Sequence, residues 1–268
     1  MNCISPAESP RIIVGTSGAT AITPTIDGSS VTWDAPGGAR LEPPLVLWGI
    51  GTPRTFRAHW MLAELDLPYT SRRIQSRTGE TMEPAFLKLN PRHKIPVLQH
   101  GTLAMAESAA IIEYLSERFD PPPTFYAPRD ASERAKLAEW CYFIMSELDS
   151  TLYVIRRHDG LKHLYGEAPT AVNAAKAYFQ EQLGAMEAQF EASQPYLFGA
   201  RLSVADILLT SCLDWAVDYG IDLPAPMLAY RARVISRPAY REARRRNNVD
   251  QWRATGPRCC GGAIMGSV

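Results

Sequence analysis

Apolar and polar positions alternate along residues 45–119 in a pattern that predicts strands and helices in succession. We predict strands over 45–48, 69–74, 96–99 and 102–105, and helices over 54–65, 83–89 and 107–118. A helix between the first two strands predicts a parallel pair with a right-handed crossover, whereas His100-Gly101 predicts a hairpin between the last two. We therefore expect an α/β domain with a mixed four-stranded sheet.

The second half of the chain has a different pattern. The segment "DPPPTFYAPRD", residues 120–130, stops helical patterning, because proline lacks the backbone donor and restricts the residue before it. Beyond it, spaced apolar residues with few strand signals predict helices over 132–158, 169–191, 203–219 and 225–246. The α/β domain is therefore followed by an all-α domain.

These patterns predict five parts of the chain. We expect a loose N-terminal extension, the α/β domain, a linker, the helical domain and a loose C-terminal tail, with bounds 1–43, 44–120, 121–131, 132–252 and 253–268. The extension is rich in small residues and proline, and it carries acidic residues but no clear amphipathic helix, which argues against a targeting peptide.

Charge and cysteine spacing exclude several classes of function. Lys plus Arg equals Asp plus Glu at 28 each, so no net charge attracts nucleic acid or an anionic membrane. No apolar run reaches the roughly 18 residues that a membrane span needs, and we expect a cytoplasmic protein. The five cysteines have no metal-ligand spacing, and Cys141 and Cys212 lie in helical patterns as expected core residues, so we expect no metal.

Candidate ligand contacts begin at the third strand, in "NPRHKIPVL". A cis Ile95–Pro96 bond leaves the Ile95 N–H and C=O at the sheet edge, where they can pair with a peptide-like ligand. From spacing alone, a trans proline at the start of a strand is the favoured alternative. His93 and Lys94 offer donors to a ligand carboxylate, although a solvated basic turn is the default for such residues.

Glu107 and Ser108 stand at the start of the helix predicted over 107–118. The unpaired first-turn amides suit a ligand carboxylate, and the Glu107 side chain suits an ammonium, so that one amino-acid zwitterion satisfies both. Simple helix capping is the alternative.

Three motifs in order resemble those of the glutathione S-transferase family, over about residues 45–246. They are "NPRHKIPVL", "ESAAIIEYL" and "GARLSVADILL", the last containing a capping box of Ser203 and Asp206. In addition, "RVISRPAYREA" resembles a late helix pair of bacterial members. The resemblance is to the serine-type members, and it implies a thioredoxin-like N-terminal domain, a cis Pro96 and an all-helical C-terminal domain.

The resemblance also implies how glutathione lies. Its γ-glutamyl end would contact Glu107 and Ser108, its cysteinyl backbone Ile95, and its glycyl carboxylate Lys94, with His93 as a further contact. The thiol then faces "GTPRTF", residues 51–56.

In that turn, "TPRTFR" places Thr52 on the serine and Arg57 on the arginine of the family's Ser-x-x-x-x-Arg motif. A hydroxyl that donates to sulfur stabilises the thiolate, and the helix N-terminus adds positive potential. Because the extra methyl of threonine restricts its torsion, Thr55 or a backbone amide is the alternative sulfur partner. Thr81 and Met82 stand where plant-type members often have His-Lys, which leaves fewer cations for the glycyl carboxylate.

The resemblance implies a cytoplasmic, homodimeric glutathione transferase for detoxification, with glutathione as co-substrate and no metal. It would conjugate the thiolate to electrophilic, apolar small molecules. Residues 45–56 contain no cysteine or tyrosine, which argues against the cysteine-type and tyrosine-type members. The alternatives are a glutathione-dependent peroxidase and a non-catalytic ligand-binding or scaffold protein on the same fold.

The helix predicted over 132–158 bears on the acceptor pocket. Its aromatic and Met side chains are Trp140, Tyr142, Phe143, Met145 and Tyr153. They either line an apolar pocket beside the thiol or belong to the core, and the core is the commoner place for such residues. The basic runs 156–158 and 244–246 are interpreted as solvated helix ends.

Overall fold

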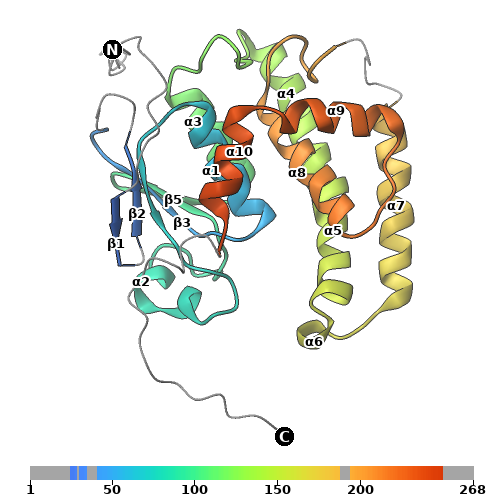
Figure 1. The fold of residues 1–268 in the computed structure, drawn as a ribbon, viewed down its shortest axis with the longest axis horizontal. Coiled ribbons are helices and arrows are strands. Elements are labelled where there is room, and N and C mark those ends of the chain that lie inside the picture. Colours follow the sequence, from blue (N-terminus) through green and yellow to red (C-terminus); the bar gives the residue numbers. More distant parts are fainter. Residues whose placement is uncertain (1–24, 29, 35–40, 188–193, 250–268) are drawn as a thin grey trace, which may run out of the picture.

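A computed structural model describes residues 25–28, 30–34, 41–187 and 194–249 (Figure 1). Its sheet has the strand order β1-β2-β4-β3-β5-β6. The strands are β1 Thr25–Asp27, β2 Ser30–Trp33, β3 Leu45–Trp48, β4 Tyr69–Arg72, β5 Val97–His100 and β6 Leu103–Ala106. Strands β3 and β4 are parallel, whereas β5 pairs antiparallel with β3 and β6. The predicted mixed sheet and its hairpin are therefore confirmed.

Alternation along β3 assigns the two faces of the sheet. Leu45 and Leu47 are buried in the main core, which the helices α1 (Pro53–Glu64) and α3 (Ser108–Arg118) share. Trp48 belongs to a second, smaller cluster that includes Phe86 of the short helix α2 (Pro84–Leu87). Since neighbouring strand residues point to opposite faces, α1 and α3 cover one face and α2 covers the other.

Residues 25–33 contradict two predictions. These are that residues 1–43 are loose and that the sheet has four strands. Strands β1 and β2 lie in that segment, and β2 pairs antiparallel with β4, so that the sheet has six strands. Trp33 is 1% exposed, and the guanidinium carbons of Arg245 and Arg246 lie 4.6 Å from its ring centroid. Arg245 and Arg246 lie far from Trp33 in the sequence, so no pattern near residue 33 predicts these contacts. Residues 1–24 and 253–268 lie outside the described part of the chain.

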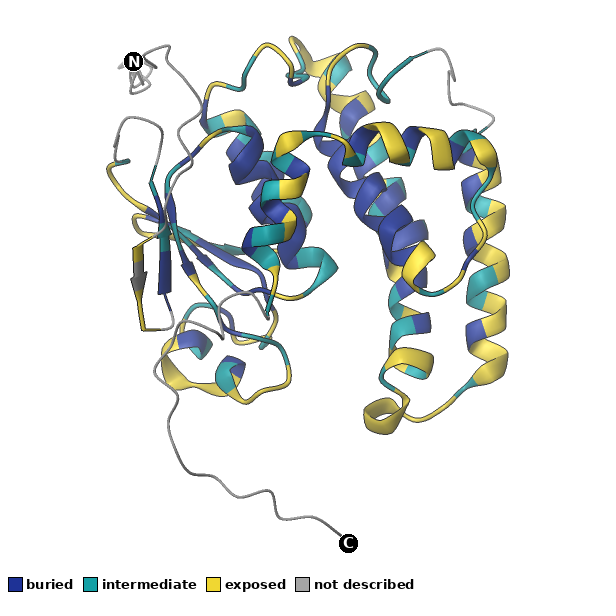
Figure 2. Cartoon of the chain, viewed as in Figure 1, coloured by how far each residue is buried: buried dark blue, intermediate teal, exposed yellow. Residues whose placement is uncertain are grey.

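The helical domain is built on one buried helix. Its helices are α4 Ala131–Phe143, α5 Ser150–Ile155, α6 Lys162–Tyr165, α7 Pro169–Glu187, α8 Val204–Asp218, α9 Ala225–Ile235 and α10 Pro238–Asn247. Wider π-helical turns at Ile144–Asp149 and Arg156–Gly160 continue α4 and α5. Helix α8 is buried along nearly its whole length (Figure 2). Thirteen of its residues are buried, so the other helices of the domain pack around it.

Local chemistry fixes two helix ends in this domain. Ser203 caps α8, and Asp206 accepts a hydrogen bond from the Ser203 N–H at 2.7 Å, which is the capping box expected there. The pattern over 225–246 is interrupted, with α9 ending at Ile235 and α10 beginning at Pro238. Proline lacks the donor needed inside a helix, and it fits the first helical position.

Helix α10 returns to the first domain and packs on α1 (Figure 1). Tyr240 makes edge contacts with the rings of Phe56 and Trp60, at centroid distances of 5.2 and 5.1 Å. Arg237 forms an ion pair with Glu64 of α1 at 2.6 Å. Helix α10 therefore stabilises α1. Thr52, the candidate sulfur partner, lies at the N-terminus of α1.

Candidate active site

The turn between β3 and α1 forms a capping box of two threonines. Thr52 is the N-cap of α1, and its Oγ1 accepts from the Thr55 N–H at 3.0 Å, while Thr55 Oγ1 accepts from the Thr52 N–H at 3.0 Å. Pro53 occupies the first helical position, where its missing N–H costs nothing. The two hydroxyl oxygens also lie 3.0 Å apart, and either can be the donor. The Thr52 hydroxyl lies at the N-terminus of a helix, where positive potential favours an anion.

The two threonines differ in access. Thr52 is half-buried and lines two cavities, whereas Thr55 is 0% exposed. The Thr55 hydroxyl lies within hydrogen-bond distance of Asn247 Oδ1 at 2.7 Å and of the Thr52 carbonyl at 2.9 Å. Thr55, which the sequence left open as the sulfur partner, is therefore turned into the protein and supports the turn instead. Asn247 also donates to the Thr52 carbonyl at 3.2 Å and accepts from the Gly51 N–H at 3.0 Å.

Arg57, the arginine of the predicted motif, is fully buried and joins the two domains. It pairs with Asp149 of the helical domain at 2.7 Å and donates to Ser211 at 2.6 Å and to Ser108 at 3.2 Å. Arg54 donates to the same Asp149 carboxylate at 3.2 Å. Burial by itself raises the pKa of Asp149, but the charges of Arg57 and Arg54 outweigh it and hold that pKa below its usual value.

Ser108 begins α3 at the other end of the site and is 2% exposed. Because its oxygen accepts from Arg57, its hydroxyl hydrogen is left for another acceptor. Glu107 before it has φ of 68° and does not cap the helix through its side chain, so the capping alternative for Glu107 is not what the structure has. Its carboxylate is exposed and pairs with Arg92 at 2.9 Å.

The loop from Asn90 to Pro96 carries the remaining predicted contacts. The Ile95–Pro96 bond is cis. The buried Asn90 side chain donates to the Lys94 carbonyl at 2.8 Å, which fixes the loop from within. His93 has φ of 57°, and its Nδ1 is buried without a hydrogen-bond partner among the described residues. His93 lines the cavity next to Thr52, and a buried ring nitrogen without a partner is a candidate for a ligand contact.

Two adjoining cavities collect these side chains into one groove. A cavity of about 490 Å³ is lined by Glu107, Ser108, Pro96, Ile95 and Lys94. A cavity of about 230 Å³ continues from Ile95, Lys94 and His93 to Thr52. The two share Arg54, Lys94, Ile95, Tyr153 and Tyr165. The structure thus brings every predicted ligand residue and Thr52 into one groove, made of two cavities that share five lining residues.

Sequence reasoning missed part of the groove wall. Arg54, Arg77 and Tyr165 all line it, and the guanidinium carbon of Arg77 lies 5.8 Å from the Tyr165 ring centroid. A hydrogen bond from Arg77 lowers the pKa of Tyr165. Arg77 lies in "SRTGE", between the second predicted strand and the short helix, and no motif in the sequence marked it.

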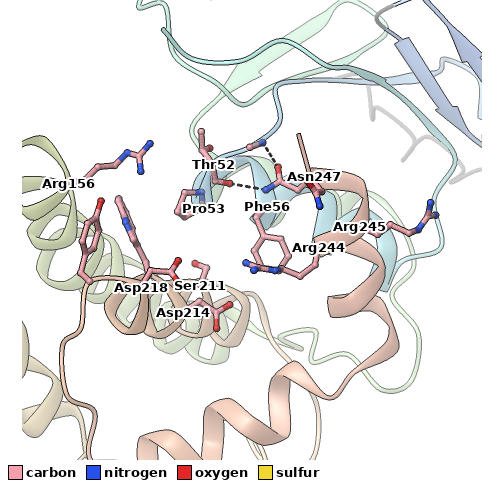
Figure 3. Close-up of a pocket in the computed structure, with 14 residues that line it drawn as sticks. Thr52, Pro53, Phe56, Arg156, Ser211, Asp214, Asp218, Arg244, Arg245 and Asn247 are labelled. Atoms are coloured by element: carbon pink, nitrogen blue, oxygen red, sulfur yellow. Dashed lines mark hydrogen bonds between the residues drawn. The ribbon is translucent and has the colours of Figure 1, made fainter. Parts of the chain in front are cut away.

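A third cavity, of about 620 Å³, lies on the other side of Thr52 (Figure 3). Its wall includes Arg156, Asp214, Trp215 and Arg244. The interpretation as solvated helix ends holds for Arg157 and Arg244, which are exposed. It is wrong for Arg156, which is half-buried and lines this cavity, and for Arg246, which is 7% exposed and pairs with Glu242. Packing of α5 beside Thr52 turns Arg156 toward the cleft.

The aromatic side chains of the 132–158 segment separate into several environments. Tyr153 lines the groove, whereas Trp140 and Phe143 line a separate cavity of about 140 Å³ beside α7, and Tyr142 is 69% exposed. Met145 lies under the groove, with its sulfur 3.2 Å from Arg57. They therefore do not form one apolar stripe beside Thr52.

The buried cysteines are unsuited to nucleophilic chemistry. Cys141 and Cys212 are 1% and 0% exposed, and burial raises the pKa of Cys212 to about 12. In the described part of the chain, no group of three His, Cys, Asp or Glu side chains is arranged to hold a metal. Among the described helices, none is both long enough and apolar enough to cross a membrane.

Comparison with known proteins identifies the family of this fold and groove. Models of the glutathione S-transferase N-terminal and C-terminal domains match residues 43–117 and 169–258. Glutathione S-transferase D6 of Drosophila melanogaster is 31% identical over 180 residues, which cover 65% of this chain and 77% of that protein. The chain belongs to the glutathione S-transferase family.

Solved structures of the family have the same architecture as this glutathione S-transferase family member. Human glutathione S-transferase T1-1, in its apo form, superposes with a TM-score of 0.65 at 25% identity, covering 75% of this chain and 88% of the human chain. A glutathione transferase homologue from Lodderomyces elongisporus, solved with two glutathione molecules per subunit, gives a TM-score of 0.69 at 23% identity. The match covers 76% of this chain and 99% of that one, and it extends the likeness in fold.

Proposed function

We propose that this chain is a glutathione transferase that conjugates the glutathione thiolate to electrophilic small molecules. The observation that carries the proposal is the continuous groove from Glu107 and Ser108 past Ile95 to the half-buried Thr52. In this proposal, residues 44–120 form the glutathione-binding domain and residues 132–252 form the helical domain beside it. Membership of the family supports the same assignment.

The proposed pose uses opposite charges at the two ends of the groove. The γ-glutamyl ammonium lies against Glu107, and its carboxylate accepts from the Ser108 amide and hydroxyl. The cysteinyl backbone pairs with Ile95, and the glycyl carboxylate lies near Lys94, His93 and Arg77, which line the same groove. Arg77 thus supplies a cation for the glycyl carboxylate. The sequence did not predict this contact, because Thr81 and Met82 stand at 81–82 in place of the His-Lys pair.

Thr52 activates the thiol in this proposal. Its hydroxyl donates to sulfur, and the N-terminus of α1 contributes positive potential, so that the thiol pKa falls. A fall of about two pH units corresponds to about 2.7 kcal/mol, within reach of one charge-assisted hydrogen bond and a helix N-terminus. The thiol proton passes to solvent. The thiolate then forms the C–S bond at the electrophilic carbon, and the leaving group departs with the electron pair of its broken bond.

We also propose that the protein is a cytoplasmic homodimer that acts in detoxification, on the strength of family membership. Light scattering of the purified protein tests the dimer, because a monomeric mass at micromolar concentration contradicts it.

Turnover of 1-chloro-2,4-dinitrobenzene with glutathione tests the activity, with Thr52→Val beside Thr52→Ser. The valine variant keeps the shape and deletes the hydroxyl, and we expect it to lose about 100-fold in kcat while still binding glutathione. The serine variant retains the hydroxyl and should keep most of the rate. Since loss of a cap costs about 1 kcal/mol, unfolding curves of both variants establish that the protein is folded in each assay.

Two other outcomes of the turnover assay would lead to different conclusions. Equal rates for the wild-type protein and Thr52→Val assign the sulfur contact to a backbone amide. No turnover by the wild-type protein with either the aryl halide or an organic hydroperoxide, while glutathione still binds, leaves a ligand-binding protein and overturns the proposed activity.

A further inference from the structure

The cavity on the acceptor side of Thr52 is charged, although the family resemblance implied an apolar acceptor. Its wall contains the aromatic rings of Phe56 and Trp215, and also Arg156, Arg244, Asp214 and Asp218. With a volume of about 620 Å³ it holds a small molecule of the size of a substituted aromatic ring. The polar side chains in this wall therefore bear on which electrophile fits.

Of these four charged side chains, Asp214 is hydrogen-bonded, and Arg244 and Asp218 are exposed. Asp214 accepts from Arg231 at 2.7 Å and from the Tyr240 hydroxyl at 2.7 Å. The guanidinium carbon of Arg244 lies 5.8 Å from the Phe56 ring centroid. Asp218 is exposed at the end of α8. Among the cations of this wall, Arg245 pairs with Glu242 at 2.6 Å and Arg244 is exposed, whereas Arg156 has a different environment.

Arg156 is half-buried, and its side chain forms no hydrogen bond or ion pair with the described part of the chain. It lines both the acceptor cavity and the groove cavity next to Thr52, as Trp215 does. Figure 3 shows its side chain directed toward Thr52, with the carboxylates of Asp214 and Asp218 below it on α8. A half-buried guanidinium without a protein partner is suited to bind a ligand carboxylate through two parallel hydrogen bonds.

We propose that Arg156 selects electrophiles that carry a carboxylate, with the reacting carbon facing the sulfur at Thr52, the acceptor ring packed beside Trp215 and the carboxylate bound by Arg156. This inference rests on the proposed function, because it assigns the acceptor of that reaction. In the step itself, the glutathione sulfur forms a bond to the ring carbon, chloride leaves with its electron pair, and the carboxylate is unchanged.

The test uses two acceptors that differ mainly in charge, 4-chloro-3,5-dinitrobenzoate and its methyl ester. We expect Arg156→Gln to lower kcat/KM for the benzoate about tenfold and for the ester less than about twofold, the size of one charged hydrogen-bonded contact. Arg156→Lys keeps the charge and should recover part of the loss. Arg134→Gln is the matched control, since Arg134 pairs with Glu117 at 3.1 Å on the exposed surface, and it should change neither value.

Binding of the two glutathione conjugates, measured by calorimetry, separates this inference from the proposed activity. Tighter binding of the carboxylate conjugate, lost in Arg156→Gln, supports the inference even if the protein turns over neither acceptor, in which case the proposed activity alone fails. Equal losses for both acceptors and both conjugates overturn the inference, because Arg156 then acts on glutathione or on the fold. Unchanged values for the benzoate and its conjugate overturn it as well.

Discussion

Arg57 of α1 and Asp149 of the helical domain form a buried ion pair at 2.7 Å, with side chains 0% and 1% exposed. The pair joins the two domains directly beneath the groove, and through Arg57 it also contacts Ser108. A charge buried this completely is costly unless its partner is present, so that the pair fixes how the domains meet.

Replacing Asp149 with Asn should destabilise the protein by about 3–5 kcal/mol, because Arg57 is left buried without a counter-ion. For a chain of this size, that corresponds to a fall in Tm of roughly 10 °C. Calorimetry at pH 7 measures it. The pKa of Asp149 is lower in the folded than in the unfolded protein, so this stabilisation is present above pH of about 4 and is lost as the pH falls through the folded value.

Glu117→Gln provides the control for Asp149→Asn. Glu117 pairs with Arg134 on the surface with both side chains more than half exposed, and such pairs contribute about 0–1 kcal/mol. Equal unfolding temperatures for the two variants would contradict this prediction, because the buried pair would then stabilise the protein no more than the surface pair does.

Replacing Glu107 with Gln should weaken glutathione binding about tenfold, because the γ-glutamyl ammonium loses its carboxylate partner. Arg92, which pairs with Glu107 at 2.9 Å, is 60% exposed, so a ligand ammonium displaces it at little cost. Arg92→Gln should therefore bind glutathione at least as tightly as the wild-type protein. Calorimetric Kd values for the two variants distinguish the charges, and an unchanged Kd in Glu107→Gln would place the ammonium elsewhere.

The stability of the protein should fall between pH 6.5 and pH 5 because of His59. This side chain is 0% exposed, and burial lowers its pKa to about 3, while its ring nitrogens contact the Tyr69 hydroxyl at 2.7 Å and the Gly49 carbonyl at 3.2 Å. Below pH 6.5 the unfolded chain takes up a proton that the folded protein does not, so each pH unit removes about 1.4 kcal/mol, or about 2 kcal/mol down to pH 5.

Urea unfolding at pH 7 and pH 5 measures this loss. His59→Gln can still donate to the Gly49 carbonyl and has no group that titrates, so its stability should change by about 2 kcal/mol less between the two pH values. Parallel losses in the variant and the wild-type protein would assign the pH dependence to other groups.

Several features of the protein were determined by the sequence itself. The order and type of the elements from β3 to α3, the stop at 120–130 and the Ser203 cap all follow from residues within a few positions of one another. Such features depend on backbone chemistry and on periodicity, which neighbouring residues carry. The start of α1 at Thr52 also depends on neighbouring residues, although the sequence left open whether Thr52 or Thr55 is the sulfur partner.

Tertiary packing decided the rest. Thr55 is excluded from the groove by Asn247, 192 residues away, and Arg57 is neutralised by Asp149, 92 residues away. The sheet gains two strands because β2 pairs with β4 and β1 pairs with β2, and Trp33 of β2 is covered by Arg245 and Arg246 of α10. Arg156 is an ordinary helix-end residue by its neighbours in sequence, and it acquires a place beside Thr52 when the two domains pack together. Burial and charge pairing of this kind depend on which distant side chains meet, and local patterns carry no record of that.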